Sequence, residues 1–228
     1  MHTVVEYCQR FLPLAFGIVF IGGLVGWRSW RFYRLYGRSP IHRPRSGDSS
    51  ANAFLSRVLV VFFGMILALG ALAAFWPEGL GAVDLLYRPP GPALLIPGLI
   101  LAALATALVW LGQEDMAASW RIGMDPGERT ELVTGGLFRF CRNPIYLGLL
   151  LALAAFCCLL PGYLSLGLLV LGAVLLQVQA RLEESYLLER HGHAYAAYCA
   201  RVGRFLQFTG RWPAPTLSPP KERDGHTH

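Results

Sequence analysis

Residues 143–180 read NPIYLGLLLALAAFCCLLPGYLSLGLLVLGAVLLQVQA, and this stretch decides the fold. It holds no charged residue, and only Pro161-Gly162 interrupts its apolar run. Neither half leaves room for the polar face that a soluble amphipathic helix presents to water. The stretch therefore predicts two antiparallel membrane helices, Ile145–Leu160 and Tyr163–Ala180, each at the short end of the ~17–25 residues that a span needs.

Two polar segments flank this hairpin and emerge on the same side of the membrane. The first, residues 130–148, reads TELVTGGLFRFCRNPIYLG, and the second, residues 179–205, reads QARLEESYLLERHGHAYAAYCARVGRF. Because both meet over the open end of the hairpin, a site can form there from Arg142, Asn143, Tyr146, Arg181, Glu183 and Glu184. The second segment predicts a helix that leaves the membrane and ends at Gly192, followed by a short helix over His193–Arg201.

The composition indicates a membrane protein throughout. Hydrophobic residues make up 54% of the chain and charged residues 15%, with a mean hydropathy of +0.45, whereas soluble domains average about a quarter charged residues. The net charge of +6 is best explained by a lipid surface, and we expect no nucleic-acid partner. Five cysteines without a C-x-x-C pair indicate neither a disulfide framework nor a metal site.

Three further apolar runs predict spans over Phe11–Trp27, Phe54–Trp76 and Ala93–Leu111. The first is not expected to be a signal peptide, because the positive charge follows it and no small-residue cleavage site is present. The predicted fold class is all-α, a polytopic membrane protein of about five transmembrane helices with a cytoplasmic cofactor pocket. We expect three parts: N-terminal spans over 1–119, a core with the hairpin and cytoplasmic helices over 120–206, and a disordered tail over 207–228.

Basic residues predict the orientation, since five spans place the termini on opposite sides. With the N-terminus outside, only Arg10 and Arg88 of the 20 Lys and Arg residues face outward, and the other 18 lie inside. An excess of Lys and Arg marks the cytoplasm. We therefore expect the N-terminus outside and the C-terminus in the cytoplasm, in a bacterial inner membrane.

The polar motifs each have a structural explanation beside a functional one. Arg142-Asn143-Pro144 suits an interfacial arginine, a turn and a first-turn proline, but a helix N-terminus also favours an anion such as a carboxylate. Glu183 and Glu184 suit solvated helix pairs, for example Arg181 with Glu184, but carboxylates near a membrane surface also hold cationic or hydroxyl-bearing ligands.

Taken together, the two polar segments resemble the isoprenylcysteine carboxyl methyltransferase family, part of a wider group of membrane methyltransferases that includes phospholipid N-methyltransferases. The resemblance covers about Trp120 to Phe205. It rests on R-[HN]-P-x-Y-x-G at Arg142–Gly148, on Glu183-Glu184, and on the G-x-x-Y-x-x-Y and V-x-R patterns that follow. It implies that S-adenosylmethionine binds on the cytoplasmic side over the hairpin, enclosed by the C-terminal segment.

The resemblance also implies roles for individual residues. Arg142 and Tyr146 are the expected catalytic residues, with Arg142 pairing either with the cofactor's carboxylate or with lipid phosphate. Gln179 aligns with the family's substrate-binding arginine and Arg181 is close to it, so both are expected to bind the acceptor. The residues expected to line or hold the cofactor are Thr130, Glu131, Leu132, Val133, Phe138, Asn143, Pro144, Ile145, Tyr146 and Glu183.

The expected function is methyl transfer to a small or lipophilic carboxylate, thiol or amine. Asn143 stands where the carboxyl methyltransferases have His, and Gln179 replaces their arginine, which weakens prenylcysteine as the substrate. A phospholipid N-methyltransferase and a thiol S-methyltransferase are alternatives. A reductase using NADPH, which the sterol reductases suggest, and a non-catalytic membrane scaffold are further alternatives.

Overall fold

The computed structural model describes residues 2–37, 51–116 and 132–205, and these residues form helices and no strand. The all-α expectation is confirmed. The elements are α1 (His2–Ile21), the π-helical η1 (Gly22–Trp27), α2 (Arg28–Tyr36), α3 (Ala51–Phe75), α4 (Pro77–Val83), α5 (Pro92–Met116), the 3₁₀ turn η3 (Gly136–Arg139), α6 (Pro144–Leu159), α7 (Tyr163–His191) and α8 (His193–Cys199). The tail expected over 207–228 lies outside the described residues.

Four helical stretches are long and apolar enough to cross a membrane: Gln9–Tyr36, Ala53–Phe75, Pro92–Met116 and Tyr163–His191. The fifth predicted span is α6, which has only 16 residues and reaches ~24 Å at ~1.5 Å per residue. Apolar side chains on the outer faces are widely exposed, for example Val60 (73%), Leu104 (51%) and Val170 (58%). Such faces suit lipid and explain how so apolar a chain buries so few of its side chains.

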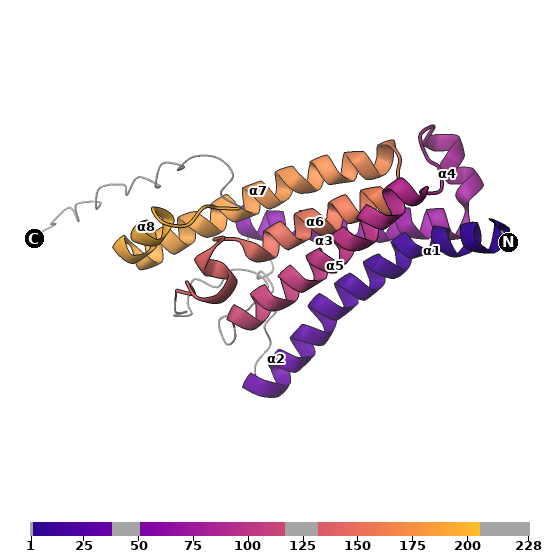
Figure 1. The fold of residues 1–228 in the computed structure, drawn as a ribbon. Helices are drawn as coiled ribbons and strands as arrows, with labels where there is room; N and C mark the ends of the chain where they lie inside the picture. Colours follow the sequence, from indigo (N-terminus) through magenta and orange to yellow (C-terminus); the bar gives the residue numbers. More distant parts are fainter. Residues whose placement is uncertain (1, 38–50, 117–131, 206–228) are drawn as a thin grey trace, which may run out of the picture.

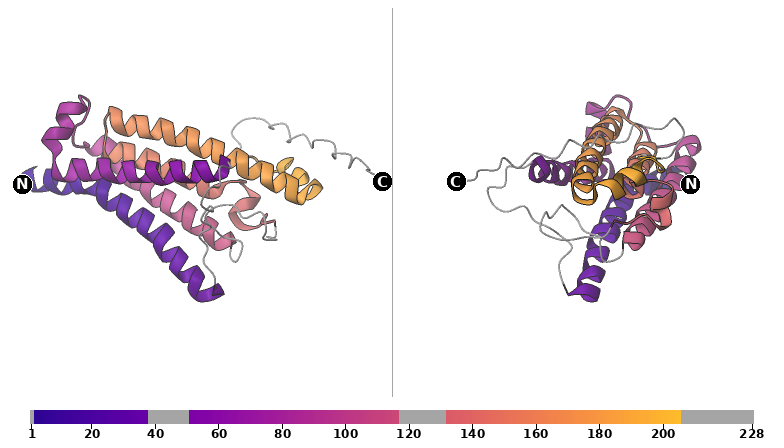
Figure 2. Two further views of the ribbon diagram at one scale, coloured as in Figure 1. Left: turned by 180° about the vertical axis from the view of Figure 1, so that it is seen from behind. Right: turned by 90° about the vertical axis from the view of Figure 1, so that its left-hand side faces the viewer.

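The helices form an elongated bundle in which α3, α5, α6 and α7 run side by side and α1 crosses α3 (Figures 1 and 2). The beginning of α1 and the helix α8 lie at opposite ends of the bundle (Figure 1). The end of α5, the beginning of α6 and the end of α7 meet at the α8 end of the bundle. This arrangement brings the two polar segments of the sequence together, as predicted.

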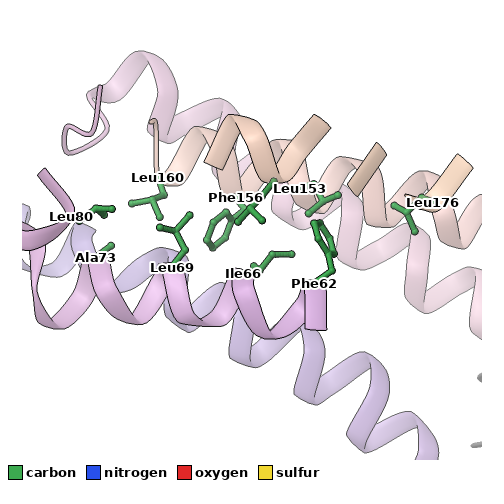
Figure 3. Close-up of a cluster of buried hydrophobic side chains, with 10 residues drawn as sticks. Phe62, Ile66, Leu69, Ala73, Leu80, Leu153, Phe156, Leu160 and Leu176 are labelled. Atoms are coloured by element: carbon green, nitrogen blue, oxygen red, sulfur yellow. The ribbon is translucent and has the colours of Figure 1, made fainter. Parts of the chain in front are cut away.

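The main core joins α3 to the hairpin. Phe62, Ile66 and Leu69 of α3 face Leu153 and Phe156 of α6 (Figure 3). Leu80 of α4, Leu160 of the hairpin turn and Leu168 and Leu176 of α7 extend the same cluster. The core therefore holds the hairpin against α3 along most of its length.

Glycines allow α5 and α6 to approach closely. A Cβ atom on Gly148 would lie 2.6 Å from Cγ2 of Val109 and 3.1 Å from the carbonyl oxygen of Ala105. A Cβ atom on Gly112 would lie 2.9 Å from Ile145. The structure places α5 against Gly148, as is typical of small residues in membrane interfaces.

The hairpin turn is fixed by a buried aspartate from the preceding loop. Asp84 is 3% exposed and accepts hydrogen bonds from the backbone N–H groups of Tyr163 (3.0 Å) and Leu164 (2.9 Å). It thus satisfies two of the free N–H groups at the beginning of α7. The segment between the predicted second and third spans thus contains both α4 and the cap of α7.

The N-terminal helix is longer than the sequence indicated. α1 continues through η1 into α2, so the basic segment after Trp27 is helical as far as Tyr36. Pro13 lies inside α1, because the helix begins well before the predicted span Phe11–Trp27. Arg28 and Phe32 of α2 are buried at 4% and 3% exposure, which explains why the helix persists beyond its apolar part.

Candidate functional site

Arg142 lies just before α6 and ties that helix to the C-terminal segment. Its Nε and Nη2 donate to Oε1 of Glu184 at 3.2 and 3.0 Å. Its Nη1 donates to the carbonyl oxygens of Val202 (2.8 Å) and Cys199 (3.3 Å). With 9% exposure and four hydrogen bonds to protein atoms, Arg142 is a structural bridge between the beginning of α6, α7 and the end of α8.

Glu184 is the centre of this network. It is 4% exposed and also accepts hydrogen bonds from Arg204, at 2.6 Å from Nη2 to Oε2, and from Nδ2 of Asn143 at 3.2 Å. Two guanidinium groups thus share one buried carboxylate, and Glu184 raises the pKa of Arg204. The helix spacing suggested Arg181 as a partner, but Arg181 is exposed and Glu184 pairs with residues distant in sequence.

Two backbone hydrogen bonds also hold the C-terminal segment. Together with the side-chain contacts of Arg142, Asn143, Glu184 and Arg204 they form a clamp at the α8 end. The N–H of Arg142 donates to the carbonyl of Gly203 at 2.9 Å, and that of Asn143 to the carbonyl of Arg204 at 3.2 Å. Pro144 follows as the first residue of α6, where its missing N–H is not needed. Asn143 and Pro144 therefore lie in the turn at the beginning of α6, which is joined on one side to residues 203–204.

The helix α8 covers the segment expected to line the cofactor. Tyr195, Tyr198, Cys199 and Val202 form a small core on which Leu132 packs. The hydroxyl of Tyr198 donates to the carbonyl of Phe138 at 2.5 Å, so both ends of this segment are held by α8. Burial raises the pKa of the Cys199 thiol, which keeps it protonated at neutral pH and unsuited to nucleophilic attack.

A second polar cluster lies between α6 and α7. The hydroxyl of Tyr146 donates to Oε2 of Glu183 at 2.7 Å. The side chain of Gln179, about one helical turn before Glu183, also contacts this hydroxyl. Its Oε1 atom is buried and has no hydrogen-bond partner among the described residues. The cluster offers hydrogen-bond acceptors, namely a carboxylate and an unpaired amide oxygen, to a group that brings N–H or O–H donors.

Most of the expected site residues lie at this end of the bundle. Leu132, Phe138, Asn143 and Pro144 border the α8 clamp, and Val133 follows Leu132 half-buried. Ile145 packs instead toward α5. Thr130 and Glu131 lie outside the described residues.

Sequence reasoning left three residues at this end without a role. Tyr198 and Arg204 fall within the recognised motifs, yet only the fold shows what they contact. Asp115 accepts a hydrogen bond from the N–H of Leu137 at 2.7 Å, and no sequence signal marked it.

The described residues contain no group of three or more His, Cys, Asp or Glu side chains that can hold a metal ion. An apolar groove of about 580 Å³ lies between α1 and α5, lined by Phe16, Ala102, Ala103, Thr106, Ala107, Trp110 and Leu111. None of the candidate site residues lines it.

Comparison with known proteins places this arrangement in a family context. Residues 94–194 match the family model described as phospholipid methyltransferase, which belongs to the isoprenylcysteine-carboxyl-methyltransferase-like group of membrane methyltransferases. The match begins in α5 and ends in α8, so it contains Arg142, Tyr146 and both glutamates. A search of curated proteins found no match. The resemblance inferred from the motifs is confirmed at the level of this group, and it supports a membrane methyltransferase.

Proposed function

We propose that this membrane methyltransferase takes the methyl group from S-adenosylmethionine and transfers it to a lipophilic acceptor at the α8 end of the bundle. The observation that carries the proposal is the Tyr146–Glu183 pair, 2.7 Å long, beside the unpaired Oε1 of Gln179. These groups lie at the open end of the α6–α7 hairpin. Its apolar part is on one side of them, and the polar segments are on the other. We further propose that this end faces the cytoplasm, because the predicted spans put 18 of the 20 Lys and Arg residues on this side of the membrane.

The residues present fit the cofactor. S-Adenosylmethionine carries an ammonium group and ribose hydroxyls, which are donors, and Glu183 and Gln179 offer acceptors. Leu132 and Phe138, held in place by α8, offer apolar side chains at the same end of the bundle. When bound, the cofactor supplies a methyl group activated on a sulfonium, and the protein's main task is to hold the two reactants in line.

In this proposal Arg142 is a positioning residue. Its guanidinium already makes four hydrogen bonds to Glu184 and to two carbonyls. It is therefore less suited to the cofactor's carboxylate than the motif suggested. Its contribution is to fix the beginning of α6, and so the place of Tyr146 one turn further on.

The acceptor is best assigned as one that loses a proton. An ionised carboxylate acceptor beside Glu183 would face like-charge repulsion. An amine or a thiol instead has a proton to release, which Glu183 can accept while Tyr146 holds the carboxylate in place. This reasoning favours an amine or thiol over the carboxylate acceptor of the carboxyl methyltransferases.

The test is binding followed by transfer. Detergent-purified protein is titrated with S-adenosylmethionine and, separately, with NADPH in a calorimeter. Methyl-labelled cofactor is then supplied with membrane lipid extract, and the labelled product is identified. Binding of NADPH alone would favour the reductase alternative, and binding of neither would favour a scaffold.

Glu183→Gln is the sharpest variant, with Glu189→Gln as its matched control, because Glu189 is exposed further along the same helix. Loss of a charge-assisted hydrogen bond costs about 1.5–3 kcal/mol. Glu183→Gln should therefore raise the dissociation constant of S-adenosylmethionine about tenfold or more. Equal constants for the two variants would remove Glu183 from the site.

A further inference from the structure

The last turn of α5 carries three successive polar residues, and each contacts a different part of the protein. Gln113, at 5% exposure, donates from Nε2 to the carbonyl of Leu24 in the π-helical η1 at 3.0 Å. Glu114 accepts from Arg28 at 2.7 Å and from Arg31 at 2.5 Å, both in α2. Asp115 accepts from the N–H of Leu137 at 2.7 Å.

The first two residues fix the end of α5 against the N-terminal helix. Arg28 also donates from Nη2 to the carbonyl of Gln113 at 2.7 Å, so its guanidinium holds both the backbone and the side chains of α5. The Arg28 side chain is only 5% exposed, whereas the side chains of Glu114 and Arg31 are 37% and 39% exposed. The end of α5 is thus a fixed point at the α8 end of the bundle.

The third residue uses that fixed point to hold the turn η3. Gly136 has a φ of 57°, a conformation that residues with a Cβ atom rarely adopt. A Cβ atom there would lie 2.2 Å from Cγ of Asp115, so only glycine lets the carboxylate reach the backbone. On its other side the same turn is held by Tyr198, which donates to the carbonyl of Phe138.

We infer that Asp115 is a positioning residue for the cofactor: it sets the place of residues 136–138, and so of Phe138, from the α5 side. The inference rests on the proposed function, since Phe138 is one of the residues proposed to line S-adenosylmethionine. It assigns a role to the α5 end that neither the motifs nor the family match supplies. It also makes α1 and α2, which lie outside the matched residues 94–194, part of the support of the site.

Two variants of Asp115 separate hydrogen bonding from charge. Asp115→Ala removes the acceptor of the Leu137 N–H, whereas Asp115→Asn keeps an acceptor oxygen of the same reach. Because the bond is exposed, its loss should raise the dissociation constant of S-adenosylmethionine by about two- to tenfold. Asp115→Asn should bind nearly as tightly as the parent.

Asp84→Ala is the matched control at the opposite end of the bundle. It removes a buried aspartate that also accepts backbone N–H bonds, so it should lower the melting temperature without changing cofactor affinity of the folded protein. If Asp115→Ala and Asp84→Ala changed affinity equally, Asp115 would act only through stability and the inference would be wrong.

Gly136→Ala tests the contact directly. In the parent, the added methyl group collides with Asp115. In the Asp115→Ala background that collision is gone, so the second substitution should weaken cofactor binding by a smaller factor than it does in the parent. If Gly136→Ala raised the dissociation constant of S-adenosylmethionine by the same factor in both backgrounds, the proposed contact would be overturned.

Hydrogen exchange distinguishes failure of this inference from failure of the proposed function. Asp115→Ala should speed exchange at the Leu137 amide, and Asp115→Asn should not. Faster exchange with unchanged affinity would overturn the role of Asp115 while leaving the methyltransferase proposal intact. If the parent does not bind S-adenosylmethionine at all, the proposed function fails, and exchange alone then decides whether Asp115 holds the turn.

Discussion

Removing the charge of Glu184 should cause the largest loss of stability of any single substitution at the α8 end. Glu184→Gln keeps the size of the side chain but leaves Arg142 and Arg204 without their shared counterion. The Arg142 side chain is 5% exposed and that of Arg204 is 20% exposed, so water compensates little for the lost charge. Breaking a buried ion pair by removing one partner costs about 3–5 kcal/mol.

This free energy converts to a measurable temperature. For a protein of this size, 1 kcal/mol shifts the melting temperature by roughly 2–4 °C, so Glu184→Gln should melt about 6–20 °C below the parent. The measurement is thermal unfolding in detergent, followed by fluorescence of the native tryptophans. Glu189→Gln, an exposed change on the same helix, should shift the melting temperature by less than about 2 °C.

A second variant removes one of the two cationic partners and leaves the Glu184 carboxylate in place. Arg204→Met leaves Glu184 paired with Arg142, so it should destabilise the protein less than Glu184→Gln does. If Glu184→Gln and Glu189→Gln have the same melting temperature, the buried carboxylate is not the centre of the clamp. The reasoning from burial would then be refuted, whatever the variant does to activity.

Three further predictions concern the rest of the fold. Asp84→Ala should lower the melting temperature by about 2–12 °C, since two N–H groups of α7 lose their acceptor at about 1–3 kcal/mol in all. Burial raises the thiol pKa of Cys141 and Cys199 in the folded protein. The stability that this shift contributes is present below the unfolded thiol pKa of about 8.5. It is lost as the pH rises through the higher folded pKa. Unfolding measured from pH 7 to 10 should therefore show decreasing stability, and replacing both by Ser should flatten the trend. A single cysteine placed at Gly81 should react with an impermeant reagent on intact cells and one at Gly192 should not; the reverse pattern would invert the proposed orientation.

The sequence was sufficient to predict the order of the apolar helices along the chain, because hydropathy acts over whole helices. The boundaries of α6 and of the long helix α7 follow from Pro144, Pro161-Gly162 and Gly192, which break or cap helices for local reasons. The helical continuation through η1 and α2 could not be predicted, since it depends on Arg28 finding Glu114 across the bundle. The cap of α7 by Asp84 depends likewise on a contact between residues 79 or 80 positions apart.

Adjacent glutamates show why the motif identified the site but not the roles within it. Successive residues of a helix point in different directions and do not face each other. Glu183 therefore accepts from Tyr146, whose hydroxyl Gln179 also contacts, while Glu184 pairs with Arg142 and Arg204. From sequence alone both carboxylates have the same chemistry, and only the position of α8 makes one of them a buried structural counterion.

The same division runs through the whole motif. Arg142 and Asn143 join Glu184 in holding the C-terminal segment, whereas Tyr146, one turn later, joins Glu183. The motif includes both sets of residues, and the two depend on each other. The clamp fixes where α6 begins, and the beginning of α6 fixes the distance from Tyr146 to Glu183. We therefore expect substitutions in the clamp to affect melting temperature first and activity through it. Substitutions at Tyr146 or Glu183 should instead reduce cofactor binding or methyl transfer in protein that still melts like the parent.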